Sequence, residues 1–235
     1  FSRPQVTVKG APTPWDNNPT PYNGNPLNDQ GMKKGYFGNI NDSSWQDFPV
    51  PWSWSYTYPW NGGRRNRFDG IGWYRREFNL PSKWKEKGKR VLLRFEGVNW
   101  QTDAWINGKT VGKRHIGGND AFTYDITSLL REGKNNISVR VYTHTGNNSY
   151  PGRVRQGIWQ PVRLLLVPEV YASRILITPD IHKSEIEINV LVKNPLPRGE
   201  KIKIRAKIVP LGVIDKGKIK SGTAQLSSLG RYELN

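Results

Sequence analysis

The sequence predicts an all-β protein with two domains, and three observations lead to this prediction. Apolar and polar residues alternate with a period of two in many short runs after residue 70, as in half-buried strands. Gly, Pro and Asn separate these runs, and no alternation of strands with long helices occurs. The chain has 235 residues, 11% of them aromatic and ten of them Trp, which suffices for one large β domain or two ordinary ones.

The composition excludes several classes of protein. No apolar run approaches the roughly 20 residues that cross a bilayer, so we predict no membrane partner. The absence of Cys excludes disulfides, thiolate metal sites and cysteine nucleophiles. His115, His144 and His182 lack the spacing of metal ligands, and we predict neither a metal nor a cofactor.

The formal charge of +17 comes from 36 Lys and Arg against 19 Asp and Glu. The excess is spread over the whole chain, and residues 64–67 form the one compact basic cluster. A nucleic-acid binder would concentrate its charge on one face, so this class is disfavoured. A basic surface that complements acidic parts elsewhere is the first interpretation, and attraction to an acidic sugar is another.

Localisation stays open from the residues alone. The chain opens at Phe1 without Met, so we expect that a signal peptide or another upstream segment was removed, by processing or by cloning. A secreted or periplasmic protein is therefore slightly favoured, and the sequence also allows a homo-oligomer.

The first seventy residues are rich in Pro, Asn and Gly, which predicts an extended wrap on the surface rather than helices. Strands follow at residues 73–78 and 90–96. Asn107-Gly108 between two alternating arms is a strong signal for a type I′ hairpin. Residues 125–130 resemble a single helical turn, and residues 136–141 and 162–166 add two more strands.

The composition changes after Pro168. Trp disappears, and charged residues alternate with β-branched ones at 185–192 and 201–208, as in a small β-sandwich. We therefore predict a domain boundary at 167/168. About four or five strand-like runs follow it, fewer than a complete sandwich needs, so we expect the second domain to be truncated.

Five motifs occur in the order of a known family. They are residues 69–78, residues 94–112 with Gly97-Val98-Asn99, residues 117–127, residues 133–136 and residues 157–162. Together they resemble the amino-terminal sugar-binding domain of glycoside hydrolase family 2, which includes β-galactosidases, β-glucuronidases and β-mannosidases. The resemblance implies a jelly-roll β-sandwich at 44–167 after a wrap at 1–43, and a partial immunoglobulin-like β-sandwich at 168–235.

The resemblance also implies what this chain lacks. In the family, two catalytic glutamates sit on a later barrel domain, one of them in an Asn-Glu pair that does not occur here. A barrel alone takes about 250 residues. We therefore expect no catalytic residue in this chain, and the missing barrel of the same enzyme as its partner.

Site residues are expected in two places. In some family members the Gly-Val-Asn loop reaches the sugar pocket of the barrel, which makes Asn99 a candidate, with Trp100 and Asp103 behind it. Trp and Tyr rings stack on the apolar faces of sugars, so the cluster of residues 52–65 is the second place. The same rings could instead pack the wrap onto the sandwich, and Trp73, Trp105 and Trp159 are expected in the core. The candidates of this cluster are Trp52, Trp54, Trp60 and Arg64.

Three functions follow, in order of preference. The first is the non-catalytic amino-terminal portion of a family 2 glycoside hydrolase, acting on O-glycosidic bonds in carbohydrate metabolism. The second is a freestanding carbohydrate-binding protein. The third, less favoured, is a basic nucleic-acid-binding protein.

Overall fold

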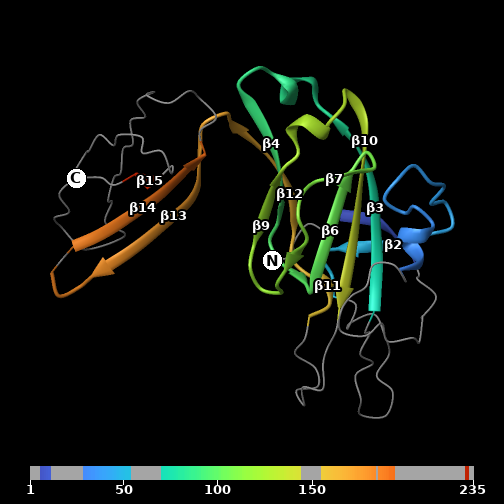
Figure 1. Ribbon diagram of the computed structural model, residues 1–235, viewed down its shortest axis with the longest axis horizontal. Coiled ribbons are helices and arrows are strands. Elements are labelled where there is room, and N and C mark those ends of the chain that lie inside the picture. Colours follow the sequence, from blue (N-terminus) through green and yellow to red (C-terminus); the bar gives the residue numbers. More distant parts are fainter. Residues whose placement is uncertain are drawn as a thin grey trace, which may run out of the picture. The chain divides into compact units, whose positions relative to one another are not determined.

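The computed structural model describes residues 6–11, 29–53, 70–143, 155–183, 185–193 and 231–232. Two compact units make up the chain, residues 1–166 and 167–235. Antiparallel strands dominate both units, which confirms the prediction of an all-β fold (Figure 1). In the described part of the chain, no helix is long and apolar enough to cross a membrane.

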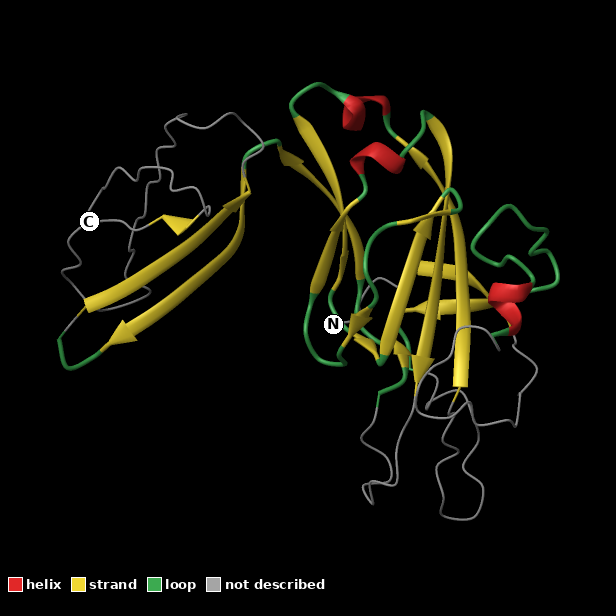
Figure 2. Cartoon of the chain, viewed as in Figure 1, coloured by secondary structure: helices red, strands yellow, loops and turns green. Residues whose placement is uncertain are grey.

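The described residues of the first unit form short and long strands, one helix and two 3₁₀ turns (Figure 2). Its elements are β1 (Val6–Ala11), α1 (Gln30–Lys33), β2 (Gln46–Val50), β3 (Gly70–Leu80), a 3₁₀ turn (Ser82–Lys85), β4 (Lys89–Phe95), β5 (Val98–Asn99), β6 (Gln101–Ile106), β7 (Lys109–Thr110), β8 (His115–Ile116), β9 (Phe122–Asp125), a 3₁₀ turn (Thr127–Leu129), β10 (Gly133–Thr143), β11 (Gly157–Ile158) and β12 (Val162–Pro168).

A large antiparallel sheet has the order β2-β1-β3-β10-β6-β7, with β8 also pairing with β6. A smaller sheet has the order β12-β4-β9, and β5 pairs with β11. The two sheets form separate layers (Figure 1). Strands β1 and β2 lie within the stretch for which the sequence predicts a wrap.

The core lies between the two sheets because each strand turns alternate side chains toward the other sheet. In β6, Ala104 and Ile106 are buried, and in β4 the residues Val91, Leu93 and Phe95 are at most 1% exposed. This alternation is the period-two pattern of the sequence. The first unit is therefore a β-sandwich, as predicted.

The opposite face of the large sheet is covered by residues 29–45. Asp29 accepts hydrogen bonds from the amides of Gly31 and Met32 at the start of α1, and from the indole of Trp73 at 3.2 Å. It also forms an ion pair with Arg140 at the middle of β10, and both side chains are 1% exposed. The charged pair holds the covering segment against the sheet. Trp73 is buried as predicted, on this outer face.

The turn at Asn107-Gly108 confirms the predicted type I′ hairpin. Asn107 has φ 51° and Gly108 has φ 81°, and β6 pairs with β7 on either side. The Asn107 amide group also donates to the carbonyl of Leu129 at 2.9 Å. The helical turn predicted at 125–130 is present as the 3₁₀ turn Thr127–Leu129.

The second unit contains a three-stranded antiparallel sheet. It is formed by β13 (Tyr171–Asp180), β14 (Glu185–Lys193) and β15 (Arg231–Tyr232) in that order. The strand predicted at 185–192 is confirmed as β14. The run predicted at 201–208 lies outside the described residues.

Replacing Gly108 with Val tests the hairpin. A β-branched residue at positive φ is strained, and we expect the variant to lose more than about 1 kcal/mol of unfolding free energy. The measurement is urea denaturation followed by circular dichroism. Lys109→Val is the control, since it adds the same side chain to the adjoining strand β7. An equal effect in both variants would contradict the turn geometry.

Replacing Asp29 with Ala tests the covering segment. Arg140 would remain buried without one of its carboxylates, so we expect a loss of about 3–5 kcal/mol in unfolding free energy. Glu77→Ala is the control, because it removes an exposed ion pair with Lys134, worth about 0–1 kcal/mol. Equal losses in the two variants would show that the buried pair does not hold the segment.

Candidate functional site

Three segments that are distant in the sequence meet beside β5. Gly157 in β11 pairs with Asn99, and β8 pairs with the start of β6 through Gln101 and Ile116. The amide of Gly117 then donates to the carbonyl of Trp100 at 3.2 Å. We call Asn99, Trp100, Gly118, Arg155 and Trp159 the rim cluster, since these residues come from the connected segments.

The backbone of Asn99 and Trp100 is fixed by the end of β10. The hydroxyl of Thr143 donates to the carbonyl of Asn99 at 2.6 Å, and the amide of Trp100 donates to the carbonyl of Tyr142 at 3.0 Å. The peptide bond between Asn99 and Trp100 is cis. The rim cluster is therefore attached to a central strand of the large sheet.

Gly97 allows the Trp159 ring to pack closely, and Gly118 lies beside the Asn99 side chain. A Cβ atom on Gly97 would lie 3.0 Å from Cζ2 of Trp159 and 2.9 Å from Cγ of Gln160. A Cβ atom on Gly118 would lie 3.4 Å from Cγ and Nδ2 of Asn99. The indole of Trp159 donates to the carbonyl of Gly118 at 2.9 Å. The ring of Trp159 is thus fixed beside both the Gly97 and the Gly118 backbone.

Aromatic and polar groups of the rim cluster are accessible. Trp100 is 42% exposed, and Trp159, expected in the core, is only half-buried. The guanidinium carbon of Arg155 lies 4.4 Å from the centroid of the Trp159 ring. Exposed rings beside hydrogen-bonding groups are the elements of a sugar-binding surface. The sequence interpretation found Asn99 and Trp100 but did not single out Arg155.

The candidate Asp103 lies in a network of ion pairs on the outer face of the large sheet. Its carboxylate accepts from Nη2 of Arg114 at 2.9 Å and from Nη1 of Arg140 at 3.1 Å. Arg140 in turn pairs with Asp29. The carboxylate of Asp103 is therefore already bound by two guanidinium groups, and its contact with a substrate stays a prediction.

The aromatic cluster predicted at residues 52–65 is described only at its start. Trp52 is half-buried, and its amide donates to the carbonyl of Ile158 at 3.0 Å. Trp52 thus borders β11, the strand that pairs with Asn99. Trp54, Trp60 and Arg64 lie outside the described residues.

Acidic groups of the first unit have the electrostatics of structural ion pairs. The hydrogen bond from Arg94 holds the pKa of Glu96 below its ordinary value, against the effect of partial burial. Burial alone would raise the pKa of Asp125, but hydrogen bonds from Thr127 and Arg90 lower it. A glycosidase general acid needs a raised pKa. Glu96 and Asp125 are therefore unsuited to that role.

His115 lies next to the rim cluster in a stacked arrangement. Its ring stacks on Phe122 with centroids 3.7 Å apart, and Nε2 lies 3.4 Å from Oδ2 of Asp120. A Cβ on Gly117 would overlap the exposed carboxylate of Asp120, which would have to shift. Within the described ranges, no three His, Asp or Glu side chains are grouped as metal ligands.

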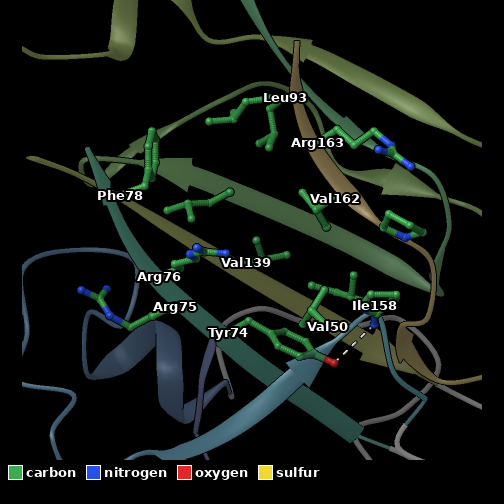
Figure 3. A pocket seen from close by; sticks show the side chains of 14 residues that line it. Val50, Tyr74, Arg75, Arg76, Phe78, Leu93, Val139, Ile158, Val162 and Arg163 are labelled. Carbon is green, nitrogen blue, oxygen red and sulfur yellow. Dashed lines mark hydrogen bonds between the residues drawn. The ribbon is translucent and has the colours of Figure 1, made fainter. Parts of the chain in front are cut away.

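A separate pocket of about 340 Å³ lies between the two sheets. Figure 3 shows Tyr74 and Val50 of the large sheet and Leu93 and Val162 of the smaller sheet around this space. The hydroxyl of Tyr74 accepts from the amide of Ile158 at 3.3 Å. The lining is mostly apolar, and its charged members are Arg75, Arg76 and Arg163, with no carboxylate among the lining residues.

Comparison of sequences places these features among known proteins. The family model of the glycosyl hydrolases family 2 sugar-binding domain matches residues 38–167. The chain is 37% identical over 113 residues to a β-glucuronidase of Bacteroides fragilis, covering 44% of this chain and 15% of that protein. It is 30% identical over 169 residues to a β-galactosidase of Priestia megaterium, covering 61% of this chain and 16% of that protein.

Comparison of structures gives the same result. A β-glycosidase from Bacteroides vulgatus superposes with a TM-score of 0.60 and 27% identity, over 83% of this chain and 25% of that one. Across the first curated relatives that it matches, the chain spans 15% to 23% of their length. The chain thus corresponds to a portion of these longer proteins.

Replacing Gly97 with Ala tests the packing of the rim cluster. The added methyl group would displace the Trp159 ring, so we expect the indole hydrogen bond to Gly118 to break and about 1–3 kcal/mol of stability to be lost. The indole N–H resonance in NMR and the melting temperature report the two effects. Gly118→Ala is the milder control, with its methyl at an ordinary contact distance. An unshifted indole resonance in Gly97→Ala would contradict this packing.

Proposed function

The chain belongs to glycoside hydrolase family 2, and from this premise we propose that it is the non-catalytic amino-terminal part of an enzyme that hydrolyses O-glycosidic bonds. The match to the sugar-binding domain over residues 38–167 is the observation that carries the proposal. The lowered pKa values of Glu96 and Asp125 support it, because neither group suits a general acid. Catalysis then belongs to a barrel domain of the same enzyme, which is the partner of this chain.

In this proposal, the rim cluster is the part of this chain that contacts the substrate. Asn99 offers an amide that can both donate to and accept from sugar hydroxyls. Trp100, which is 42% exposed, offers a ring face for the apolar side of a pyranose. The bonds from Thr143 and Tyr142 hold both residues on the sheet, which favours a binding contact over a mobile loop.

The substrate is a β-glycoside in this proposal. The relatives named above are a β-glucuronidase and a β-galactosidase, which share the β linkage and differ in the sugar. Asp103 is a weaker candidate for sugar contact, since Arg114 and Arg140 already bind its carboxylate. For the second unit we propose the beginning of an immunoglobulin-like sandwich, which fits the antiparallel pairing of β13 and β14.

A freestanding carbohydrate-binding protein is the alternative, and the exposed ring of Trp100 favours it. The two proposals differ in what the 235-residue chain does alone. Tight, saturable binding of neutral or acidic oligosaccharides in calorimetry would favour the binding protein. Weak binding by the chain, together with hydrolysis by the enzyme that contains it, would favour the first proposal.

Replacing Asn99 with Ala in the intact enzyme tests the role of the rim cluster. Loss of a hydrogen bond to the sugar, worth about 0.5–1.5 kcal/mol or more in the transition state, should lower kcat/KM by about tenfold with folding unchanged. Hydrolysis of nitrophenyl β-glycosides and the melting temperature give the two readouts.

Asn79→Ala is the matched control for this experiment. Asn79 is exposed and lies opposite Lys134, near the other end of β10 from Thr143. We expect its kcat/KM to equal that of the wild type. If Asn99→Ala also keeps wild-type kinetics, Asn99 is a turn residue and the proposed sugar contact is wrong.

A further inference from the structure

Arg155 is a cation without a carboxylate partner among the residues that the structure describes. Its side chain is exposed, and its described contact is the stack over Trp159 at 4.4 Å. Two other arginines of the first unit have carboxylate partners. Arg94 pairs with Glu96 at 2.9 Å, and Arg114 pairs with Asp103 at the same distance.

The backbone around Arg155 is fixed by contacts with two distant segments. The amide of Gln156 donates to the buried hydroxyl of Ser53 at 2.9 Å. Gly157 pairs with Asn99, so Arg155 lies two residues from the strand pair that positions the rim cluster. The ring beneath the guanidinium is held by the indole hydrogen bond to Gly118. The guanidinium group of Arg155 therefore stacks on an indole ring whose position is fixed.

A guanidinium that stacks on an indole keeps the N–H groups at its edge available. These groups match the two oxygens of a carboxylate or of a sulfate ester in a bidentate arrangement. The described residues offer Arg155 no carboxylate partner, and residues 144–154, which precede it in the sequence, contain neither Asp nor Glu. An anion from outside the chain is the matching partner.

We propose that Arg155, supported by Trp159, binds the anionic group of a sugar that also contacts Asn99. The shared chemistry is a carboxylate or a sulfate ester on a pyranose. This inference rests on the proposed function, since the rim cluster must first face a carbohydrate. It adds that the cluster selects acidic sugars over neutral ones.

NMR titration of the 235-residue chain tests the site directly. The reporters are the Nε–H of Arg155 and the indole N–H of Trp159. Methyl β-glucuronide and methyl β-glucoside differ only in a carboxylate against a hydroxymethyl group, and glucose 6-sulfate provides the sulfate. We expect saturable shifts with both acidic sugars and at least about tenfold weaker binding of the neutral one, as for the loss of a hydrogen bond to a charged group.

Two variants show whether the preference for acidic over neutral sugars depends on Arg155. Arg155→Gln should remove the preference for acidic sugars, while the neutral sugar binds as before. Arg131→Gln removes the same charge from an exposed residue near the start of β10, at the opposite end from Thr143, and should keep the preference. A preference that survives in Arg155→Gln, or equal binding of acidic and neutral sugars by the wild type, would overturn the proposal.

A further titration uses inorganic sulfate alone, to separate binding of a free anion from binding of an acidic sugar. If it binds as tightly as glucose 6-sulfate, the site recognises free anions and its assignment to sugars is wrong. Hydrolysis assays keep this result separate from the proposed function. An intact enzyme that cleaves β-glycosides with no dependence on Arg155 would refute this inference alone, whereas an enzyme that cleaves no glycoside would refute the proposed function.

Discussion

The buried ion pairs of Arg140 constrain the rest of the first unit. Arg140 lies at the middle of β10, between β3 and β6, and its side chain is 1% exposed. A guanidinium in that position is stable only when carboxylates neutralise it, and Asp29 and Asp103, which are distant from each other in the sequence, do so. The segment that begins at Asp29 must therefore cover the outer face of the large sheet. The core thus lies on one face of this sheet and the covering segment on the other, and the rim cluster lies at the ends of strands.

The pairing of β10 within the large sheet also fixes the position of the rim cluster. Strand β10 is flanked by β3 and β6 over most of its length, and its last residue, Thr143, bonds to the carbonyl of Asn99. A candidate binding residue is thus attached directly to the best-paired strand of the sandwich. Function carried by connecting segments on a rigid scaffold is the common arrangement in β proteins.

Local signals explain which features the sequence predicts. Asn107-Gly108 forms its turn because both residues accept positive φ, and β6 alternates because one of its faces lies in the core. The role of Trp159 depends instead on distant residues. Its apolar surroundings in the sequence favour the core, but Gly97 and Gly118 place its ring in the rim cluster. Asp103 likewise has ion-pair partners, Arg114 and Arg140, that no spacing rule connects.

In the proposed function, this chain contributes to binding and not to catalysis. Hydrogen bonds from Arg94 to Glu96, and from Thr127 and Arg90 to Asp125, lower the pKa values of these carboxyl groups, which suits structural ion pairs and not a general acid. Groups such as Asn99 and Arg155 can still affect rate, because binding energy from parts of the substrate remote from the reacting bond can stabilise the transition state. A rigid sandwich suits this role. If the contact residue lay on a mobile loop, part of its binding energy would be offset by the entropy cost of ordering that loop.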